Sequence, residues 1–264
     1  MGLTDFKNRG WVKFKAEKSM LRWQKYVQPI AEEISFDPKQ KREWLRHGNT
    51  WFAGVNILKN DKDGRFNGGP RLEGTVVQFL TDLHGPLALD HGQLSIIYPG
   101  YPIFDGSESE AAHRYRSARD GAHVDGILPI GPDRRRFVQE PHQYVLGIPL
   151  VEASSDASPM VIWEGSHHII WEAFRCAFKD KPMSDWLKID VTEAYHKARK
   201  RCFEKCRRVA IYAQSGESYV IHRLALHGMS PWNKKAKAPD CGRMIAYFRP
   251  EGRAGDLGDW LNGY

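Results

Sequence analysis

Long apolar runs and low-complexity tracts are absent from this chain of 264 residues. Its longest apolar stretches, such as residues 147–151, fall far short of the ~20 residues that cross a bilayer. The first residues contain no apolar signal-peptide core and soon become amphipathic. We therefore expect a cytoplasmic protein that does not interact with a membrane.

Cysteine is also scarce, with four residues: Cys176, Cys202, Cys206 and Cys241. They are too few and too scattered for a disulfide framework in a chain of this length. Cys202 and Cys206 are one helical turn apart, but a structural zinc site would need a second close pair. We interpret all four as reduced thiols.

Charge of one sign prevails only mildly, because 39 basic residues face 32 acidic ones and give a net charge of +7. Basic residues cluster at 134–136, 197–208 and 234–237, and no nucleic-acid-binding motif accompanies them. A solvated basic surface is the first interpretation, and a substrate with phosphate or carboxylate is the second. Nucleic acid is not expected as a partner. A hydrophobic content of 41% excludes disorder as the main state.

The sequence contains no internal repeat and no Ser/Gly/Pro linker, so we expect one domain over residues 1–264. Apolar residues recur at helical spacing over residues 16–33, and Asp37-Pro38 predicts a turn before a short helix at 39–46. Residues 1–73 should therefore form an N-terminal helical layer.

From residue 74 onward, short β-type segments predominate. We predict strands at 93–98, 144–151, 160–163, 218–221, 224–227 and 243–248, and either a strand or a buried helical segment at 75–80. Such a series predicts an all-β sandwich or barrel. Helical spacing returns at 169–208. The predicted fold is mainly β with α additions: a jelly-roll core over 74–250, a helical insertion at 169–208 and a C-terminal tail at 251–264.

His123-Val124-Asp125 is the only His-x-Asp or His-x-Glu triplet in the chain. Alone it carries little weight, because 11 histidines and 32 acidic residues are expected to produce such a triplet by chance. On an extended strand, however, side chains at i and i+2 face the same side, about 6.5–7 Å apart at their backbones. An imidazole and a carboxylate so placed can both reach one metal ion, and the flanking glycines leave room for the backbone to bend.

A third ligand is available downstream, where His222 and His227 compete. His227 is preferred because it closes an apolar run and is followed by Gly228. The two histidines differ by an odd number of residues, so on one continuous strand they would face opposite sides. We expect His227 to bind the metal and His222 to be hydrogen-bonded within the core.

Two histidines and one carboxylate leave three coordination positions open, which is typical of Fe(II) sites used for oxygen chemistry. Zinc hydrolases use similar ligands, so the triad alone does not decide the reaction. Arg243, sixteen residues beyond His227, presents a planar donor fork that suits the distal carboxylate of a 2-oxo diacid. Arg249 lies on the same face but roughly 20 Å along the strand, so we expect it to form a surface salt bridge instead.

Four motifs, His123-Val124-Asp125, Gly165-Ser166-His167, His227 and Arg243, resemble those of the phytanoyl-CoA dioxygenase family of Fe(II)/2-oxoglutarate-dependent oxygenases. Residues 5–12 are also similar to the Gly-aromatic-Val strand with which that family opens. The chain departs from the family in having Glu164 where a proline is usual, and in its long 169–208 insertion.

The resemblance implies a double-stranded β-helix fold, with iron bound by His123, Asp125 and His227 and 2-oxoglutarate held by Arg243. It makes residues 165–167 a structural turn. Because related halogenases have a small residue in place of Asp125, it also implies hydroxylation. The implied reaction uses O2 and 2-oxoglutarate, hydroxylates a small molecule and releases succinate and CO2.

Tyr98, on a predicted strand upstream of the metal motif, is a candidate hydroxyl donor to the cosubstrate, with a core tyrosine as the alternative. Two further functions stay open: a nucleic-acid-directed oxidative demethylase, favoured only by the positive charge, and a jelly-roll protein that binds a metal or ligand without catalysis.

Overall fold

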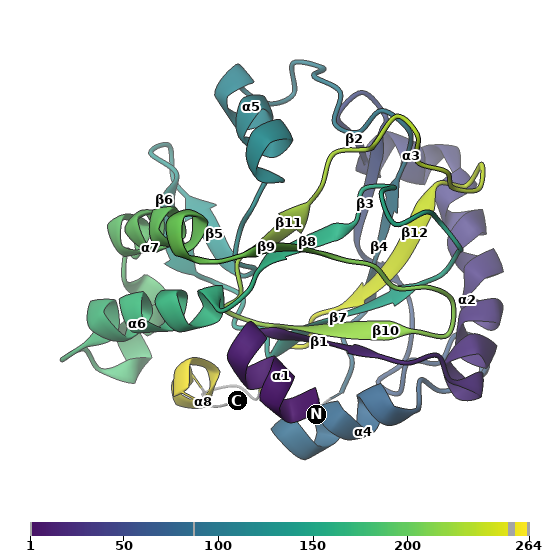
Figure 1. Cartoon of the computed structure of the whole chain (residues 1–264). Coiled ribbons are helices and arrows are strands. Elements are labelled where there is room, and N and C mark those ends of the chain that lie inside the picture. The colour runs from purple at the N-terminus through teal and green to yellow at the C-terminus, as the bar shows by residue number, and fades with distance from the viewer. Residues whose placement is uncertain (1, 87, 253–256, 263–264) are drawn as a thin grey trace.

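The computed structural model describes residues 2–86, 88–252 and 257–262 (Figure 1). The helices are α1 (Gly2–Arg9), α2 (Lys18–Phe36), α3 (Pro38–Trp44), α4 (Thr75–His84), α5 (Glu110–Arg119), α6 (Ser166–Phe178), the 3-10 helix η1 (Met183–Lys188), α7 (Thr192–Lys205) and α8 (Leu257–Asn262). The strands are β1 (Trp11–Phe14), β2 (Leu45–Arg46), β3 (Trp51–Leu58), β4 (Gly92–Ile97), β5 (Ile127–Ile130), β6 (Arg135–Val138), β7 (Tyr144–Pro149), β8 (Met160–Trp163), β9 (Arg208–Ile211), β10 (Ser218–His222), β11 (His227–Met229) and β12 (Arg243–Phe248).

Two antiparallel sheets form the core. The larger has the order β1-β10-β7-β12-β4-β3-β2 and the smaller the order β11-β8-β9. Apolar side chains from both sheets, including Val145 and Ile245 of the larger and Ile162 of the smaller, form one buried cluster between them. The arrangement is the predicted jelly roll, a double-stranded β-helix whose interior lies between the sheets.

Strand β12 shows why the central strands are mostly apolar. Ile245 and Tyr247 face the interior, whereas Met244, Ala246 and Phe248 face the outer side of the sheet. Successive side chains of a strand alternate between faces, and both faces of this sheet are covered, so each must be apolar. This pattern agrees with the position of β12 in the middle of the larger sheet, where it pairs with β7 on one side and β4 on the other.

Helices α2 and α4 cover the outer face of the larger sheet, through residues such as Trp23 and Val27 of α2 and Leu80 of α4 (Figure 1). The N-terminal 73 residues are more than the helical layer we expected, because β1, β2 and β3 extend the larger sheet at both edges. Residues 75–80, which had two interpretations, belong to helix α4.

The insertion at 169–208 is helical as predicted, with α6, η1 and α7 packed against the outer face of the smaller sheet (Figure 1). The C-terminal region is not merely a tail, because α8 buries Trp260 and Leu261 in the same cluster. Residues 253–256 and 263–264 of that region lie outside the described residues. Among the described residues, no helix is both long and apolar enough to cross a membrane.

Candidate metal centre

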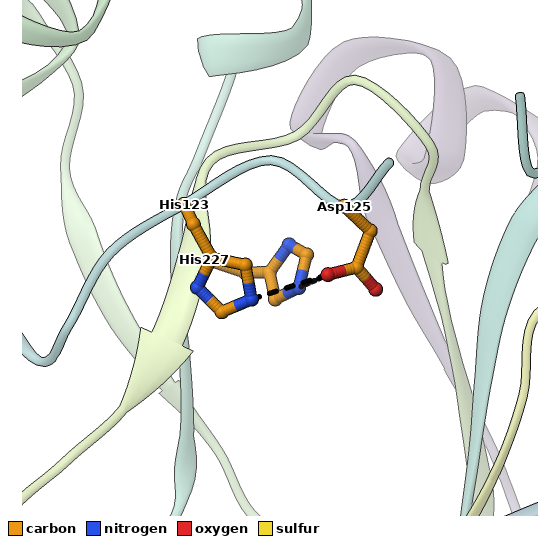
Figure 2. A group of neighbouring side chains, drawn as sticks. All are labelled: His123, Asp125 and His227. Atoms are coloured by element: carbon orange, nitrogen blue, oxygen red, sulfur yellow. Dashed lines mark ion pairs between the residues drawn. The ribbon is translucent and has the colours of Figure 1, made fainter. Parts of the chain in front are cut away.

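The side chains of His123, Asp125 and His227 converge, with one ligand atom from each lying within 4.8 Å of the others. Figure 2 shows both imidazole rings directed toward the carboxylate from two separate segments of chain. Nε2 of His123 is 3.1 Å and Nε2 of His227 is 3.6 Å from Oδ1 of Asp125. The structure therefore brings together the three residues that the sequence predicts as ligands.

A short backbone pairing holds the two segments against each other. The amide of His123 donates to the carbonyl of His227 at 2.8 Å, and the reverse bond is 3.0 Å long. The amide of Met229 donates to the carbonyl of Asp120 at 2.8 Å. This approach requires Gly228, because a Cβ atom there would lie 2.3 Å from the Asp120 carbonyl oxygen. The glycine after His227 thus lets the two ligand-bearing segments meet.

Each ligand histidine is oriented through its other nitrogen. Nδ1 of His123 lies 3.0 Å from the carbonyl oxygen of Gly121, and Nδ1 of His227 lies 2.9 Å from that of Ala225. A carbonyl only accepts, so Nδ1 carries the proton in each ring and Nε2 presents a lone pair to the centre. Two imidazoles that can bind through Nε2 and one carboxylate are a donor set that fits a divalent transition metal with open coordination positions.

Electrostatics keep the carboxylate ionised. Burial alone would raise the pKa of Asp125, but the neighbouring Arg249 guanidinium and His227 outweigh it and hold that pKa well below its usual range. Burial likewise opposes the charged form of His227, yet the Asp125 carboxylate raises the pKa of this imidazole. The carboxylate is therefore available as an anionic ligand.

The triad lies in the wall of a cavity of about 230 Å³ whose lining also includes Trp51, Tyr101, Val145, Met160 and Tyr247. The His227 side chain is 4% exposed and that of His123 is 54% exposed, so the centre is open on the His123 side. Most of the lining is apolar, and such a pocket suits a small organic molecule.

Arg243 is buried at the start of β12, and its Nη1 donates to Sδ of Met229 at 3.4 Å. Met229 follows His227 by two residues on β11, faces the same side and lines the cavity. Among the described residues, Arg243 forms no ion pair with a carboxylate. A buried guanidinium without an anionic partner is a costly arrangement, and an incoming carboxylate would relieve it.

Two tyrosines that the sequence did not single out stand between Arg243 and the cavity. The hydroxyls of Tyr219 and Tyr247 are 2.8 Å apart, Tyr247 lines the cavity, and Tyr219 contacts Arg243. Tyr219 lies on β10 and Tyr247 on β12, and each is paired with Gly147 of β7. A Cβ atom at Gly147 would lie 2.3 Å from the Tyr219 ring. The even spacing of Tyr247 from Arg243 is a sequence signal that would have placed both on one face of β12.

Arg249 is not in the surface salt bridge that we expected. Its side chain is 16% exposed, lines the cavity, and places Nη1 3.4 Å from Oδ2 of Asp125. β12 crosses the whole interior, so Arg243 and Arg249 lie at its opposite ends and contact different parts of the site. The distance along the strand predicted that the two arginines are far apart, but it could not show that the metal motif lies at the Arg249 end.

Two other candidates lie away from the cavity. Tyr98 packs against the outer cluster of the larger sheet, where burial raises its pKa to about 12, so the structure does not place it to reach a cosubstrate in the cavity. His222 is buried and its Nδ1 accepts a hydrogen bond from the amide of Leu224 at 3.1 Å. It lies outside the metal-ligand group, in the core environment that the sequence predicted for it.

No protein-family model and no curated protein matches the sequence. Among solved structures, the chain is similar to the non-heme alpha ketoglutarate dependent carbocyclase SnoK from nogalamycin biosynthesis, with 12% identity over 97% of this chain and 88% of that one, at a TM-score of 0.45. It is also similar to EctD from S. alaskensis with bound Fe, with 14% identity, coverages of 94% and 75%, and a TM-score of 0.49.

A third similar structure is HygX from Streptomyces hygroscopicus with nickel, 2-oxoglutarate and hygromycin B bound, with 11% identity, coverages of 96% and 85%, and a TM-score of 0.45. With identities of 14% or less and TM-scores below 0.5, these three alignments add nothing to what the chain's own geometry shows. The resemblance to the phytanoyl-CoA dioxygenase family stays a prediction.

Proposed function

We propose that this protein is an Fe(II)- and 2-oxoglutarate-dependent dioxygenase that hydroxylates a small-molecule substrate. The observation that carries the proposal is the convergence of two imidazole Nε2 atoms and one carboxylate oxygen beside a cavity. His123, Asp125 and His227 would hold the metal and leave coordination positions for a cosubstrate and O2. Bound Fe(II) and 2-oxoglutarate would together supply the activation of O2, with release of succinate and CO2.

Arg243 is the residue that we propose for the distal carboxylate of 2-oxoglutarate. It is buried and lacks a carboxylate partner within the described residues. It also contacts Met229, which lies two residues beyond His227 on the same face of β11. The Tyr219 and Tyr247 hydroxyls supply donors between Arg243 and the cavity. We therefore assign these two tyrosines, rather than Tyr98, as supporting donors to the cosubstrate.

The remaining cavity residues serve to bind the substrate and to exclude water. The apolar side chains of Val145, Met160 and Met229 line the cavity beside the triad. An apolar wall keeps water from a reactive centre and strengthens the electrostatic contacts inside it. The exposed edge of His123 marks the side from which a substrate would enter.

Nucleic acid is not part of the proposal, and three arginines of the basic clusters are paired with carboxylates within the protein. Arg135 pairs with Asp190, Arg207 with Glu164, and Arg208 with Asp120. These arginines belong to the basic clusters at 134–136 and 197–208, and their paired charge is less available to phosphates. The alternative of a protein that binds a metal or ligand without catalysis is tested by turnover: consumption of O2 and 2-oxoglutarate by the iron-loaded protein would exclude it.

The decisive experiment is anaerobic addition of Fe(II) and then 2-oxoglutarate to the purified protein. A chelated 2-oxo acid gives a visible charge-transfer band, and we expect that band in the wild type. Arg243→Met should raise the 2-oxoglutarate concentration needed for half of the signal by about 10–100-fold, because a buried charged hydrogen bond is lost. A folded, iron-loaded protein that shows no band would contradict the cosubstrate assignment.

The choice of ligands is tested by a matched pair of histidine variants. His227→Ala should abolish stoichiometric Fe(II) binding, whereas His222→Gln should leave it intact, because His222 is outside the ligand group. Both histidines are buried, so thermal unfolding of each variant controls for loss of the fold. If His222→Gln lost iron and His227→Ala retained it, the third ligand would be misassigned.

A further inference from the structure

Arg249 places a partly buried guanidinium directly behind the carboxylate of Asp125. Oδ1 of Asp125 faces Nε2 of His123 and of His227, whereas Oδ2 faces Nη1 of Arg249 at 3.4 Å. The two carboxylate oxygens therefore have different partners. One is presented to the metal position, and the other is directed away from it.

The position of Arg249 is fixed from its backbone. Its amide donates to Oδ1 of Asp90 at 2.9 Å, which anchors the chain just beyond the end of β12. Its Nε atom is buried and has no hydrogen-bond partner among the described residues. A buried donor without a partner costs free energy, so the Arg249 side chain is not placed to satisfy all of its own N–H groups. The ion pair that its guanidinium does form is with Asp125.

We propose that Arg249 is a positioning residue, which holds the Asp125 carboxylate so that it offers one oxygen to the metal. The inference rests on the proposed metal centre. A carboxylate free to rotate would present both oxygens to a bound ion and would occupy a coordination position that a cosubstrate or O2 needs. A cation beside Oδ2 opposes that rotation, and partners that orient a ligand in this way typically change metal affinity by 10–100-fold when they are removed.

The test uses Co(II), whose visible absorption reports coordination number and geometry without turnover. Arg249→Met should raise the dissociation constant for Co(II) by about 10–100-fold and should change the position and intensity of its visible bands. Arg249→Lys, which restores the charge but not the planar fork, should recover part of the affinity and move the spectrum back toward that of the wild type. Arg201→Met, the same replacement at an exposed arginine that pairs with Glu172 and does not line the cavity, should leave Co(II) affinity and spectrum unchanged.

Each outcome separates this inference from the proposed function. Co(II) binding that His227→Ala does not weaken would overturn the metal centre and with it the role of Arg249. Binding that depends on His227 but has wild-type affinity and spectrum in Arg249→Met would overturn the role of Arg249 alone. Tighter binding with an unchanged spectrum would also overturn it, because Arg249 would then act only by charge repulsion. If Arg249→Met fails to fold, Arg249→Gln provides the same comparison.

Discussion

The metal centre depends on a glycine as much as on its ligands. At Gly228 the obstacle to a side chain is backbone, since a Cβ atom would lie 2.3 Å from the Asp120 carbonyl oxygen. Backbone cannot rotate away as a long side chain can. A methyl group at this position must therefore separate β11 from the segment that carries His123 and Asp125.

We predict that Gly228→Ala destabilises the protein by about 1–3 kcal/mol, as overpacking of a core does. It should also weaken metal binding, because the spacing between His227 and the other two ligands changes. Denaturant unfolding and Co(II) titration measure the two effects. Wild-type metal affinity in a folded Gly228→Ala variant would show that the close approach of the two segments is not needed.

Gly147 provides the matched experiment at the other end of the interior. A Cβ atom there would lie 2.3 Å from the ring of Tyr219, which is 1% exposed and packed in the cluster between the sheets. Gly147→Ala should therefore cost stability of the same order, about 1–3 kcal/mol, and should weaken 2-oxoglutarate binding by displacing the tyrosine pair. Metal affinity should stay at the wild-type value. A variant that loses metal binding but keeps 2-oxoglutarate binding would contradict the proposed division of the site.

Pairwise spacing allowed the ligand residues to be predicted, but not their surroundings. His123 and Asp125 share a face by alternation, and His227 followed from its apolar run and from Gly228. The contact between Arg249 and Asp125 joins residues 124 positions apart in the sequence. No local pattern contains that information. Tyr98 was misplaced for the related reason that alternation fixes which residues share a face, but not which face points inward.

At the scale of elements, Asp120 joins three parts of the site. It ends helix α5 in the left-handed conformation, with a φ of 57°. Its carboxylate accepts two hydrogen bonds from Arg208 of β9, at 2.8 and 2.7 Å, and its carbonyl accepts from Met229 of β11. The Asp120 residue is 5% exposed, and Arg208 is the cation that pairs with its carboxylate. The junction fixes where the chain enters the metal motif.

Arg208→Met should destabilise the protein by about 1–3 kcal/mol, because it leaves a buried carboxylate unpaired. The effect stays below that of a fully buried pair, since the Arg208 side chain is 45% exposed. Arg201→Met is the matched control. Its pair with Glu172 is half-exposed on both sides, and such pairs contribute about 1 kcal/mol or less. Equal urea midpoints for the two variants would count against the junction.

Strong periodicity made some elements predictable and left others hidden. Met160–Trp163 and Arg243–Phe248 are strands with the predicted bounds, because both are apolar runs bounded by turns. In the segment predicted as a strand at 224–227, Leu224 ends a turn, residues 225–226 are irregular, and β11 begins only at His227. Leu224 and Leu226 are buried in the cluster under the helical insertion, and Ala225 is buried in the cluster between the two sheets. An apolar run reports burial, and burial alone does not specify a strand.

At the scale of the whole molecule, the N-terminus is joined to the helical insertion through Glu164. This carboxylate accepts hydrogen bonds from Arg9, Trp11 and Arg207 at 2.7–3.1 Å. It stands where the phytanoyl-CoA dioxygenase resemblance expects proline. Glu164 thus joins the segment before β1 to the residue before β9, and β1 (Trp11–Phe14) lies where the resemblance of residues 5–12 implied an opening strand.

Four histidines gather beneath α1, where that helix meets the rest of the fold. His167 and His168 of α6 have ring centroids 3.9 Å apart, and His167 is 4.8 Å from His222 of β10. Burial lowers the pKa of His167 to about 4, and burial with the charge of Arg223 lowers that of His84 of α4 to about 4. Burial also holds the pKa of His222 well below its usual value, with Arg223 adding to the effect. The rings of His167, His84 and His222 are therefore neutral in the folded protein near neutral pH.

This cluster predicts acid sensitivity of the whole fold. An unfolded histidine titrates near pH 6.5, so between about pH 6.5 and pH 4 the unfolded chain binds protons that the folded chain excludes. The contribution of these histidines to the unfolding free energy is fully present above about pH 6.5. It falls as the pH decreases through that window, by up to about 1.4 kcal/mol per pH unit for each histidine.

His167→Gln removes one of these buried histidines and keeps a donor for the Lys7 carbonyl, which His167 Nε2 contacts at 2.9 Å. We expect it to reduce the loss of unfolding free energy between about pH 7.5 and pH 5 by about 1–2 kcal/mol, measured by urea unfolding. The exposed His91 is the control, and His91→Gln should leave the loss unchanged. An equal pH dependence in His167→Gln and the wild type would exclude His167 as a source of the acid sensitivity.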